Sequence, residues 1–398
     1  MSFLVNGAEE NTSPVVSGEK NETSPDELNL PDIRKEIDAI DRQIMALFQQ
    51  RMRAAEKVAA VKKRDGSPIF QPQREQEILE RVEREGGQFG SGARTLMATL
   101  IDISCTYQQM LLYGDDGKLR KKLMTARSEW KGSKIACQGT VGAYSHLAAR
   151  QFFGEDVEPM FFAKFQDVFE AVTEGYADFG VLPLENTTVG AVNDVYDLLT
   201  RHGFYIIGET DVDINHCLLA PKGAKMEDIR EVYAHPQALG QCARYIRLHG
   251  FNANEYSNNA VAAQHVARWN DPTKAAIASS VAGQKFGMAI LDEDIQDIQG
   301  NQTRFIIISK HLVIRDGADK ISLTFSLPHR TGSLYRVLSR FSANGMNISK
   351  IESRPLKGRN FQYRFYLDFN GNVHDEKVCA LICSLSTEMS NFKFLGNY

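Results

Sequence analysis

The chain has 398 residues, of which 43% are hydrophobic, and a formal net charge of −4. This length predicts two or three domains rather than one. A charge so close to neutral creates no overall field for nucleic acid or an acidic membrane, so any anionic ligand must be bound by local cations.

Residues 1–30 are rich in Asn, Ser, Glu and Pro, which predicts a disordered tail. Their apolar start, residues 3–5, is too short for the core of a signal peptide, and no segment is long enough to span a bilayer. Six cysteines without CxxC pairs indicate reduced thiols in a cytoplasmic protein. No histidine pairs with them at zinc-ligand spacing, so we expect no metal site.

Residues 31–115 are predicted to form an all-helical domain. Apolar residues recur at helical spacing over 30–64, and this stripe continues onto Arg51 and Lys62. These two cations are 62 − 51 = 11 positions apart and therefore lie within about 20° of each other on an ideal helix. An unpaired buried charge costs several kcal/mol, so both need an anion, which is either an internal carboxylate or a ligand.

Two more helices are predicted in this domain, one starting at Pro72 and one running from about Thr95 to Leu112. On the last helix Ser104 and Gln108 occupy a stripe that would otherwise be apolar. A site of cations and neutral hydrogen-bonding groups, with no nucleophile, suits a reaction that needs only orientation and charge stabilisation.

Residues 116–132 are dense in Lys and Arg and are predicted to be a linker or a solvated helix. Over 133–310 short strands alternate with helices, which predicts an α/β domain of mainly parallel sheet, large enough for two lobes around a cleft. Residues 139–146 and 185–190 follow strands, where a turn either binds a ligand or caps a helix. The strand candidates are 135–137, 180–182, 205–207, 217–219, 275–277 and 305–308.

Residues 318–398 show the order strand, helix, strand, strand, helix, strand, which predicts an α+β ferredoxin-like domain. Small domains of this kind bind and regulate more often than they catalyse, although fold alone does not decide this.

The helical segment resembles chorismate mutase of the all-helical class. The resemblance implies an intertwined dimer in which Arg34 crosses into the partner's site. It also implies that Lys62 and Gln108 stabilise charge on the ether oxygen of chorismate and that Glu75 binds the ring hydroxyl. Gln71 stands where this family often has Asp, so we expect altered affinity. The residues that carry the resemblance, or are implied to bind substrate, are Arg34, Arg51, Lys62, Gln71, Arg74, Glu75, Ser104 and Gln108.

The α/β segment resembles prephenate dehydratase through residues 139–146, 185–190, 235–237 and 301–305. The resemblance implies a two-lobed, periplasmic-binding-protein-like domain that removes carbon dioxide and water from prephenate. Thr303 would donate a hydrogen bond or proton to the leaving hydroxyl, and neighbours must orient it because threonine is a weak acid. His235 is either an alternative acid or a structural residue. The implied dehydratase residues are Ser145, Glu185, Asn186, Thr187, Gln241, Thr303, Arg304 and Phe305.

Neighbouring side chains on a strand face opposite ways, so Arg304 reaches the cleft beside Thr303 only if the strand is irregular there.

The C-terminal segment resembles the ACT domain of prephenate dehydratases through residues 330–334, 345–347 and 352–355. The resemblance implies that L-phenylalanine binds where two ACT domains pair. A ligand-free dimerisation module is the alternative, and Tyr335 leaves the selectivity for phenylalanine open. The implied effector-binding residues are Gly332, Ser333, Leu334, Asn347, Glu352, Ser353 and Arg354.

Together these resemblances predict a bifunctional, phenylalanine-inhibited enzyme of phenylalanine biosynthesis. We expect it to be cytoplasmic, a homodimer or higher oligomer, and to use no metal, nucleotide or redox cofactor. Two alternatives stay open: a dehydratase whose helical arm only dimerises, and a non-catalytic amino-acid sensor.

Overall fold

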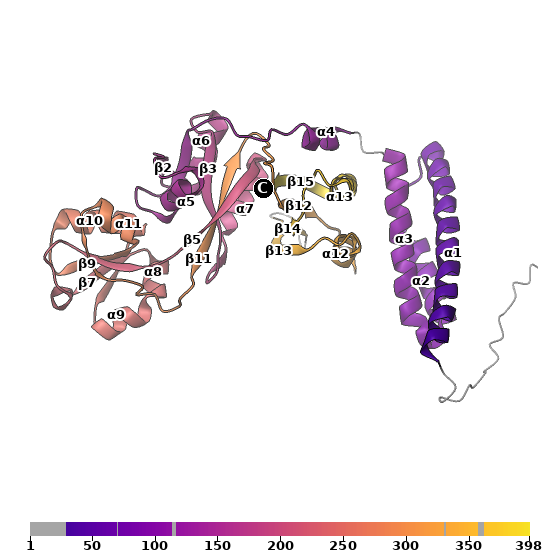
Figure 1. The fold of residues 1–398 in the computed structure, drawn as a ribbon, viewed down its shortest axis with the longest axis horizontal. Coiled ribbons are helices and arrows are strands. Elements are labelled where there is room, and N and C mark those ends of the chain that lie inside the picture. Colours follow the sequence, from indigo (N-terminus) through magenta and orange to yellow (C-terminus); the bar gives the residue numbers. More distant parts are fainter. Residues whose placement is uncertain (1–28, 70, 114–116, 330–331, 357–361) are drawn as a thin grey trace, which may run out of the picture. The chain divides into compact units, whose positions relative to one another are not determined.

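The structure is a computed structural model that describes residues 29–69, 71–113, 117–329, 332–356 and 362–398. It divides into two compact units, residues 1–72 and 73–398 (Figure 1). The predicted disordered tail over 1–30 falls almost wholly outside the described residues. Among the helices that are described, none has the length and apolar character needed to cross a membrane.

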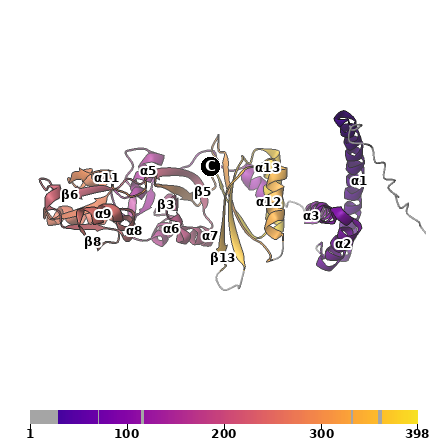
Figure 2. The ribbon, with the colours of Figure 1, turned by 90° about the horizontal axis from the view of Figure 1, so that it is seen from below.

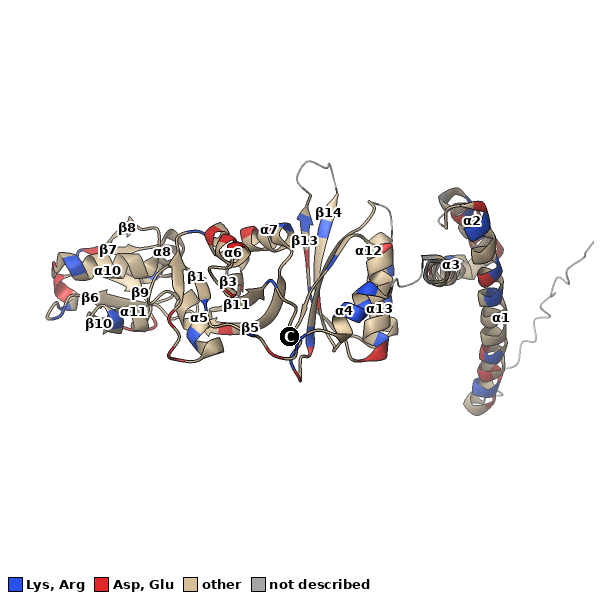
Figure 3. Ribbon diagram, turned by 90° about the horizontal axis from the view of Figure 1, so that it is seen from above, with Lys and Arg blue, Asp and Glu red and all other residues tan. Residues whose placement is uncertain are grey.

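The first unit contains one long helix, α1 (Leu30–Asp65), as the apolar spacing predicted. Gly66 ends it in the left-handed conformation, with its N–H bonded to the Lys62 carbonyl. In Figure 3 the ribbon of α1 carries blue segments (Lys and Arg) and red segments (Asp and Glu) interspersed along its length. Its apolar residues Ile37, Ile40, Ile44 and Leu47 are each about half exposed or more. The helix thus carries an uncovered apolar stripe between charged residues.

The next helices are α2 (Pro72–Glu85), the short 3₁₀ helix η2 (Gly87–Phe89), α3 (Gly90–Tyr113) and α4 (Lys118–Met124). The third helix starts earlier than predicted because the glycine-rich break is confined to η2. A Cβ atom on Gly90 would lie 2.2 Å from the Glu83 carbonyl oxygen, so the close approach there requires glycine. The basic segment around α4, predicted to be a linker or a solvated helix, packs against the C-terminal domain. Its residue Leu123 is 1% exposed and belongs to the core of that domain.

The first lobe has a sheet ordered β2-β1-β3-β11-β5, with β4 paired to β3. Its elements are β1 (Ile135–Gln138), α5 (Tyr144–Phe153), β2 (Met160–Phe162), α6 (Phe165–Glu174), β3 (Phe179–Asn186), β4 (Gly190–Ala191), α7 (Asn193–His202), β5 (Tyr205–Asp213) and β11 (Gln302–Ser309).

The second lobe has a sheet ordered β10-β6-β9-β7-β8. Its elements are β6 (Cys217–Ala220), η3 (Met226–Asp228), β7 (Glu231–Ala234), α8 (Pro236–Gln241), α9 (Ala243–His249), β8 (Asn252–Glu255), α10 (Asn259–Trp269), β9 (Lys274–Ala278), α11 (Ser280–Lys285) and β10 (Ala289–Asp292).

Both sheets are mixed, so the expectation of mainly parallel sheet was wrong. β1 runs parallel to β2 and β3, whereas β11 runs antiparallel to both β3 and β5. The chain leaves the first lobe after β5, builds the second lobe and returns as β11. A strand that re-enters from the second lobe runs opposite to β3, and no local pattern in the sequence records that direction.

The C-terminal domain confirms the predicted βαββαβ order. Its four-stranded sheet is ordered β13-β14-β12-β15, and both helices lie on one side of it (Figure 2). The other face packs on the first lobe, where the Tyr366 hydroxyl donates to the Tyr196 carbonyl at 2.9 Å. The elements are β12 (Lys320–Ser326), α12 (Ser333–Ala343), β13 (Ile348–Pro355), β14 (Tyr363–Asn370), α13 (Glu376–Glu388) and β15 (Ser390–Asn397).

Candidate active sites

A cavity of about 460 Å³ is lined by residues of both lobes of the α/β domain. Asn186, Thr303 and Phe305 line it from the first lobe, and His235 and Gln241 from the second. Its size is within the range of about 300–1,000 Å³ that is typical of small-molecule sites.

The cavity suits an anion although, among its described lining residues, there is no Lys, Arg, Asp or Glu. Residues 143–145 at the start of α5 and 258–260 at the start of α10 line it. Helix N-termini carry partial positive charge. At α5 no side chain of the described residues caps the first N–H groups, whereas at α10 the Asn258 side chain accepts from the N–H groups of Ala260 and Val261. The backbone therefore supplies the electropositive environment that side chains do not.

Strand register decides which neighbours of Thr303 face the cavity. Thr303 and Phe305 line it, while Arg304 faces the other way and bonds Asp211 of β5 through two contacts, at 2.9 and 3.0 Å. These contacts raise the pKa of the guanidinium and lower the pKa of the Asp211 carboxyl. On β3 a register shift brings both Pro183 and Asn186 to the cavity side.

The side-chain amide of Asn186 is oriented by the main chain. Its Oδ1 accepts from the backbone N–H groups of Thr188 (3.0 Å) and Val189 (3.1 Å), which can only donate. The other amide atom is therefore Nδ2, which donates to Thr303 Oγ1 at 2.8 Å. Since Thr303 Oγ1 accepts this bond, its own hydroxyl hydrogen stays available to a second partner.

The Asn186 nitrogen also approaches two further acceptors, Asn301 Oδ1 at 2.7 Å and the Gln302 carbonyl at 3.0 Å. Its two hydrogens are thus shared among three acceptors, and the amide stays anchored if one of them is removed.

A hydrogen-bond chain links this pair to the second lobe. Thr188 Oγ1 donates to Asn186 Oδ1 at 2.7 Å and accepts from Gln241 Nε2 at 3.1 Å. Gln241 Oε1 lies 2.8 Å from Nε2 of His216. His216 is 1% exposed, and burial lowers its pKa, so the imidazole is neutral and its Nε2–H donates to Gln241. The Tyr144 hydroxyl lies 3.3 Å from the other ring nitrogen.

Sequence reasoning did not single out His216 or Thr188. His216 lies in the crossing between β5 and β6 and belongs to no motif, so no signal pointed to it. Thr188 adjoins Thr187, the residue that was selected, whose Oγ1 instead accepts from the Gln302 N–H at 2.9 Å.

Some of the predicted dehydratase residues line the cavity between the lobes and others do not. Ser145, Asn186, Gln241, Thr303 and Phe305 line the cavity, whereas Glu185, Thr187 and Arg304 do not. His235 lines the cavity and also caps α8, since its Nδ1 accepts from the Gln237 N–H at 3.2 Å.

The predicted mutase residues are distributed over both units, so each group is described by itself. In the first unit, which contains Arg34, Arg51, Lys62 and Gln71, the Lys62 ammonium donates to the Ile69 carbonyl at 2.6 Å.

The second unit contains the other mutase residues, Arg74, Glu75, Ser104 and Gln108. Ser104 and Gln108 on α3 are 5% and 7% exposed. Gln108 Oε1 is buried with no hydrogen-bond partner among the described residues.

The predicted effector residues lie in two parts of the C-terminal domain, at the start of α12 and along β13. Gly332 precedes α12 with φ at +79°, and the hydroxyl of Ser333 is buried with no partner within the described parts of the chain. Asn347 donates to Asn370 Oδ1 at 3.1 Å, while Arg354 lies 3.6 Å from Asp197 of α7. Arg330 and Thr331 of the same motif lie outside the described residues.

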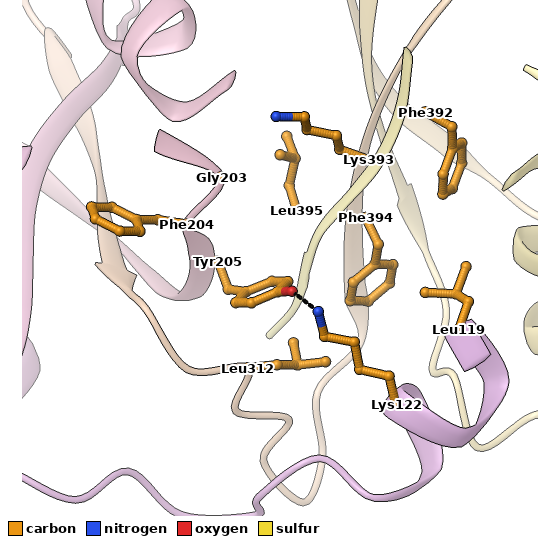
Figure 4. A pocket seen from close by; sticks show the side chains of 10 residues that line it. All are labelled: Leu119, Lys122, Gly203, Phe204, Tyr205, Leu312, Phe392, Lys393, Phe394 and Leu395. Carbon is orange, nitrogen blue, oxygen red and sulfur yellow. Dashed lines mark hydrogen bonds between the residues drawn. The ribbon is translucent and has the colours of Figure 1, made fainter. Parts of the chain in front are cut away.

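A second cavity, of about 310 Å³, lies among α4, β5 and β15 (Figure 4). The Lys122 ammonium bonds the Tyr205 hydroxyl and lies 4.9 Å from the centre of its ring. Lys393 points away from Lys122 and donates to the Thr200 carbonyl at 2.6 Å. Because both lysines serve packing contacts, this cavity presents no convergent polar group.

Comparison with known proteins identifies the family of the chain. Residues 135–312 match the family model described as prephenate dehydratase, and residues 33–109 match chorismate mutase type II. Over 375 residues the chain is 32% identical to the bifunctional chorismate mutase/prephenate dehydratase of Enterobacter agglomerans, covering 92% of this chain and 95% of that one. This chain belongs to the bifunctional chorismate mutase/prephenate dehydratase family. The predicted family and multidomain fold class are therefore confirmed, and the chain is an isomerase and a lyase of phenylalanine biosynthesis.

Two solved structures resemble about two thirds of this chain. The prephenate dehydratase of Arthrobacter aurescens in complex with L-Phe is 30% identical, with a TM-score of 0.61, covering 67% of this chain and 89% of that one. A structure named as a novel type of quorum quenching acylase, GqqA, is also 30% identical with a TM-score of 0.61, covering 66% and 96%.

Proposed function

We propose that the cavity between the two lobes converts prephenate to phenylpyruvate and that Thr303 hydrogen-bonds the leaving hydroxyl. The observation that carries this is the Asn186–Thr303 bond of 2.8 Å, in which Thr303 accepts and keeps its hydroxyl hydrogen. Accepting a bond from the amide also polarises that hydroxyl as a donor.

The chemistry requires little else from the protein. The bond from the ring to the carboxylate carbon breaks, and its electron pair enters the ring as carbon dioxide leaves. The ring–oxygen bond then breaks, and hydroxide leaves as water after it receives a proton. Aromatisation drives these steps, so stabilising charge on the leaving oxygen is the main task. The N-terminus of α5, whose first N–H groups no side chain of the described residues caps, would bind a substrate carboxylate.

For the mutase step we infer that Lys62 and Gln108 stabilise charge on the ether oxygen and that Arg34, Arg51 and Arg74 bind carboxylates. One observation supports this for Lys62: its ammonium donates to the Ile69 main-chain carbonyl, and an ammonium has further N–H groups for an anionic oxygen. For Gln108 the side-chain NH2 group would have this role, since only that end of the amide can donate. Glu75, Ser104 and Gln71 would bind the remaining polar groups of chorismate.

We also infer a homodimer or higher oligomer that assembles through α1. Ile37, Ile40, Ile44 and Leu47 repeat along one face of this helix and are 47–63% exposed. A second copy of the same helix would bury this stripe and allow Arg34 to serve the partner's site. Size-exclusion chromatography with light scattering tests this inference, and Ile40→Asp should yield monomers.

L-Phenylalanine is the effector that we propose for the C-terminal domain. The Arthrobacter relative was solved in complex with L-Phe, and the buried hydroxyl of Ser333 follows Gly332 at the start of α12. We propose that backbone N–H groups of residues 332–334 take its carboxylate, with Asn347 and residues 352–354 shaping the adjoining surface. We further expect the enzyme to act in the cytoplasm.

Coupled turnover of chorismate to phenylpyruvate by the pure protein tests the proposal as a whole. A protein that turns over only prephenate has a helical arm for dimerisation alone, and one that turns over neither but binds phenylalanine is a sensor. An acylase would need an activated nucleophile. Two of the cavity hydroxyls, those of Ser145 and Ser279, donate to the main-chain carbonyls of Gln138 and Gly142, which does not favour that activity here.

A further inference from the structure

Glu185 connects the strand of the dehydratase site to the ACT sheet. It directly precedes Asn186 on β3, but its side chain lies outside the cavity lining. Glu185 Oε2 accepts from the Lys350 ammonium of β13 at 2.6 Å. The two side chains are 35% and 14% exposed, so the pair is shielded better than a surface ion pair. The same ammonium lies 5.4 Å from the centre of the Tyr196 ring on α7.

The strand is irregular where this contact is made. β3 pairs Glu185 with Arg304 but Pro183 with Phe305, so its register against β11 shifts between these two pairs. A bulged segment lacks some of the ladder bonds that hold a regular strand. A side-chain anchor at Glu185 therefore has a larger influence on where Asn186 lies, and hence on its bond to Thr303.

The other end of the contact lies among the proposed effector residues. Lys350 is on β13, between Asn347 and residues 352–354. β13 is the edge strand of its sheet, and its own register shifts between Ile348 and Lys350. An edge strand has only one neighbour to hold it, so ligand binding beside it can move it at low cost.

We propose that Lys350 is a positioning residue of the dehydratase. Through Glu185 it sets the Asn186 amide against Thr303, and phenylalanine inhibits by displacing β13 and with it this ammonium. The proposal rests on the dehydratase and effector sites proposed above. It adds the path by which one acts on the other.

Three full-length variants test this inference. Lys350→Met removes the ammonium and keeps the length of the side chain, and Lys350→Arg keeps the charge. Lys320→Met is the matched control, because Lys320 is 15% exposed and pairs with Glu209 at 2.5 Å across the same contact between ACT sheet and first lobe. Glu209 belongs to β5 rather than to β3. Arg304, which Glu209 also approaches at 3.6 Å, remains held by Asp211.

We expect Lys350→Met to lower the dehydratase kcat by about 10- to 100-fold, as small displacements of catalytic groups do, with KM nearly unchanged. Mutase turnover should be unaffected, which shows that the helical domain is intact, and the retained phenylalanine binding described next shows that the C-terminal domain folds. Calorimetry should still detect phenylalanine binding, but prephenate should no longer weaken it, since coupling between the sites is lost. Lys350→Arg should recover most of kcat, and Lys320→Met should retain both kcat and inhibition.

Several results would overturn the proposal. Parental kcat and parental inhibition in Lys350→Met would do so, and so would an equal loss in Lys320→Met, which would indicate general docking of the ACT sheet. Glu185→Gln supplies the second measurement. If its effect simply adds to that of Lys350→Met in the double variant, the ion pair is not the path. Parental protein that fails to dehydrate prephenate would refute the proposed function itself, so that assay comes first.

Discussion

Replacing Thr303 by valine tests the dehydratase chemistry with the smallest change in shape. Valine keeps the β-branched shape and removes the hydroxyl that should bond the leaving group. The loss of one donor to a developing oxyanion costs about 2.7–4 kcal/mol, or about 10²- to 10³-fold in kcat. We expect a loss of that size in the conversion of prephenate to phenylpyruvate, followed by the absorbance of the product.

The structure also predicts that the variant folds. Thr303 is 8% exposed, but its main partner, the Asn186 amide, keeps Asn301 Oδ1 and the Gln302 carbonyl as acceptors. No donor is orphaned, so the cost in stability should be only about 1 kcal/mol. Thr324→Val is the control, because Thr324 is fully buried in the sheet of the C-terminal domain and its hydroxyl has no partner among the described residues. If Thr303→Val still dehydrates prephenate at near the parental rate, the reasoning fails and another donor, such as His235, must be sought.

Three further predictions concern the mutase, the effector site and pH. Lys62→Ala should lower mutase turnover about 10²-fold or more while supplied prephenate is still dehydrated; near-normal mutase activity would exclude the role in charge stabilisation. A Cβ atom at Gly332 would meet no atom of the described residues within 4 Å, but φ is +79° there, so Gly332→Val is strained. Phenylalanine inhibition should vanish in this variant while uninhibited dehydratase activity persists, and unchanged affinity by calorimetry would place the effector site elsewhere. Burial lowers the pKa of His216 in the folded protein, so as the pH falls the unfolded chain takes up the proton first, and the free energy of unfolding should decrease below about pH 6.5. His216→Gln should make the free energy of unfolding, measured by chemical denaturation, less dependent on pH. An unchanged pH dependence would contradict the assignment of a neutral, buried His216.

The sequence by itself determined the parts that depend on local pattern. Helical periodicity located α1, and strand–turn motifs located the loops that line the cavity. Both patterns involve residues that are neighbours in the sequence, so the covalent chain itself keeps these residues close together. The resemblance of two separate segments to prephenate dehydratase pointed to Thr303 and Asn186, although 117 positions separate them.

Only the tertiary structure decided how these segments meet. The antiparallel return of β11 places Thr303 opposite Asn186, and register turns Arg304 away to Asp211. His216 contacts Gln241 of the second lobe, and Glu185 contacts Lys350, 165 positions along the chain. Such contacts depend on strand direction, bulges and domain packing, which are set by burial of the whole chain rather than by any neighbouring residues.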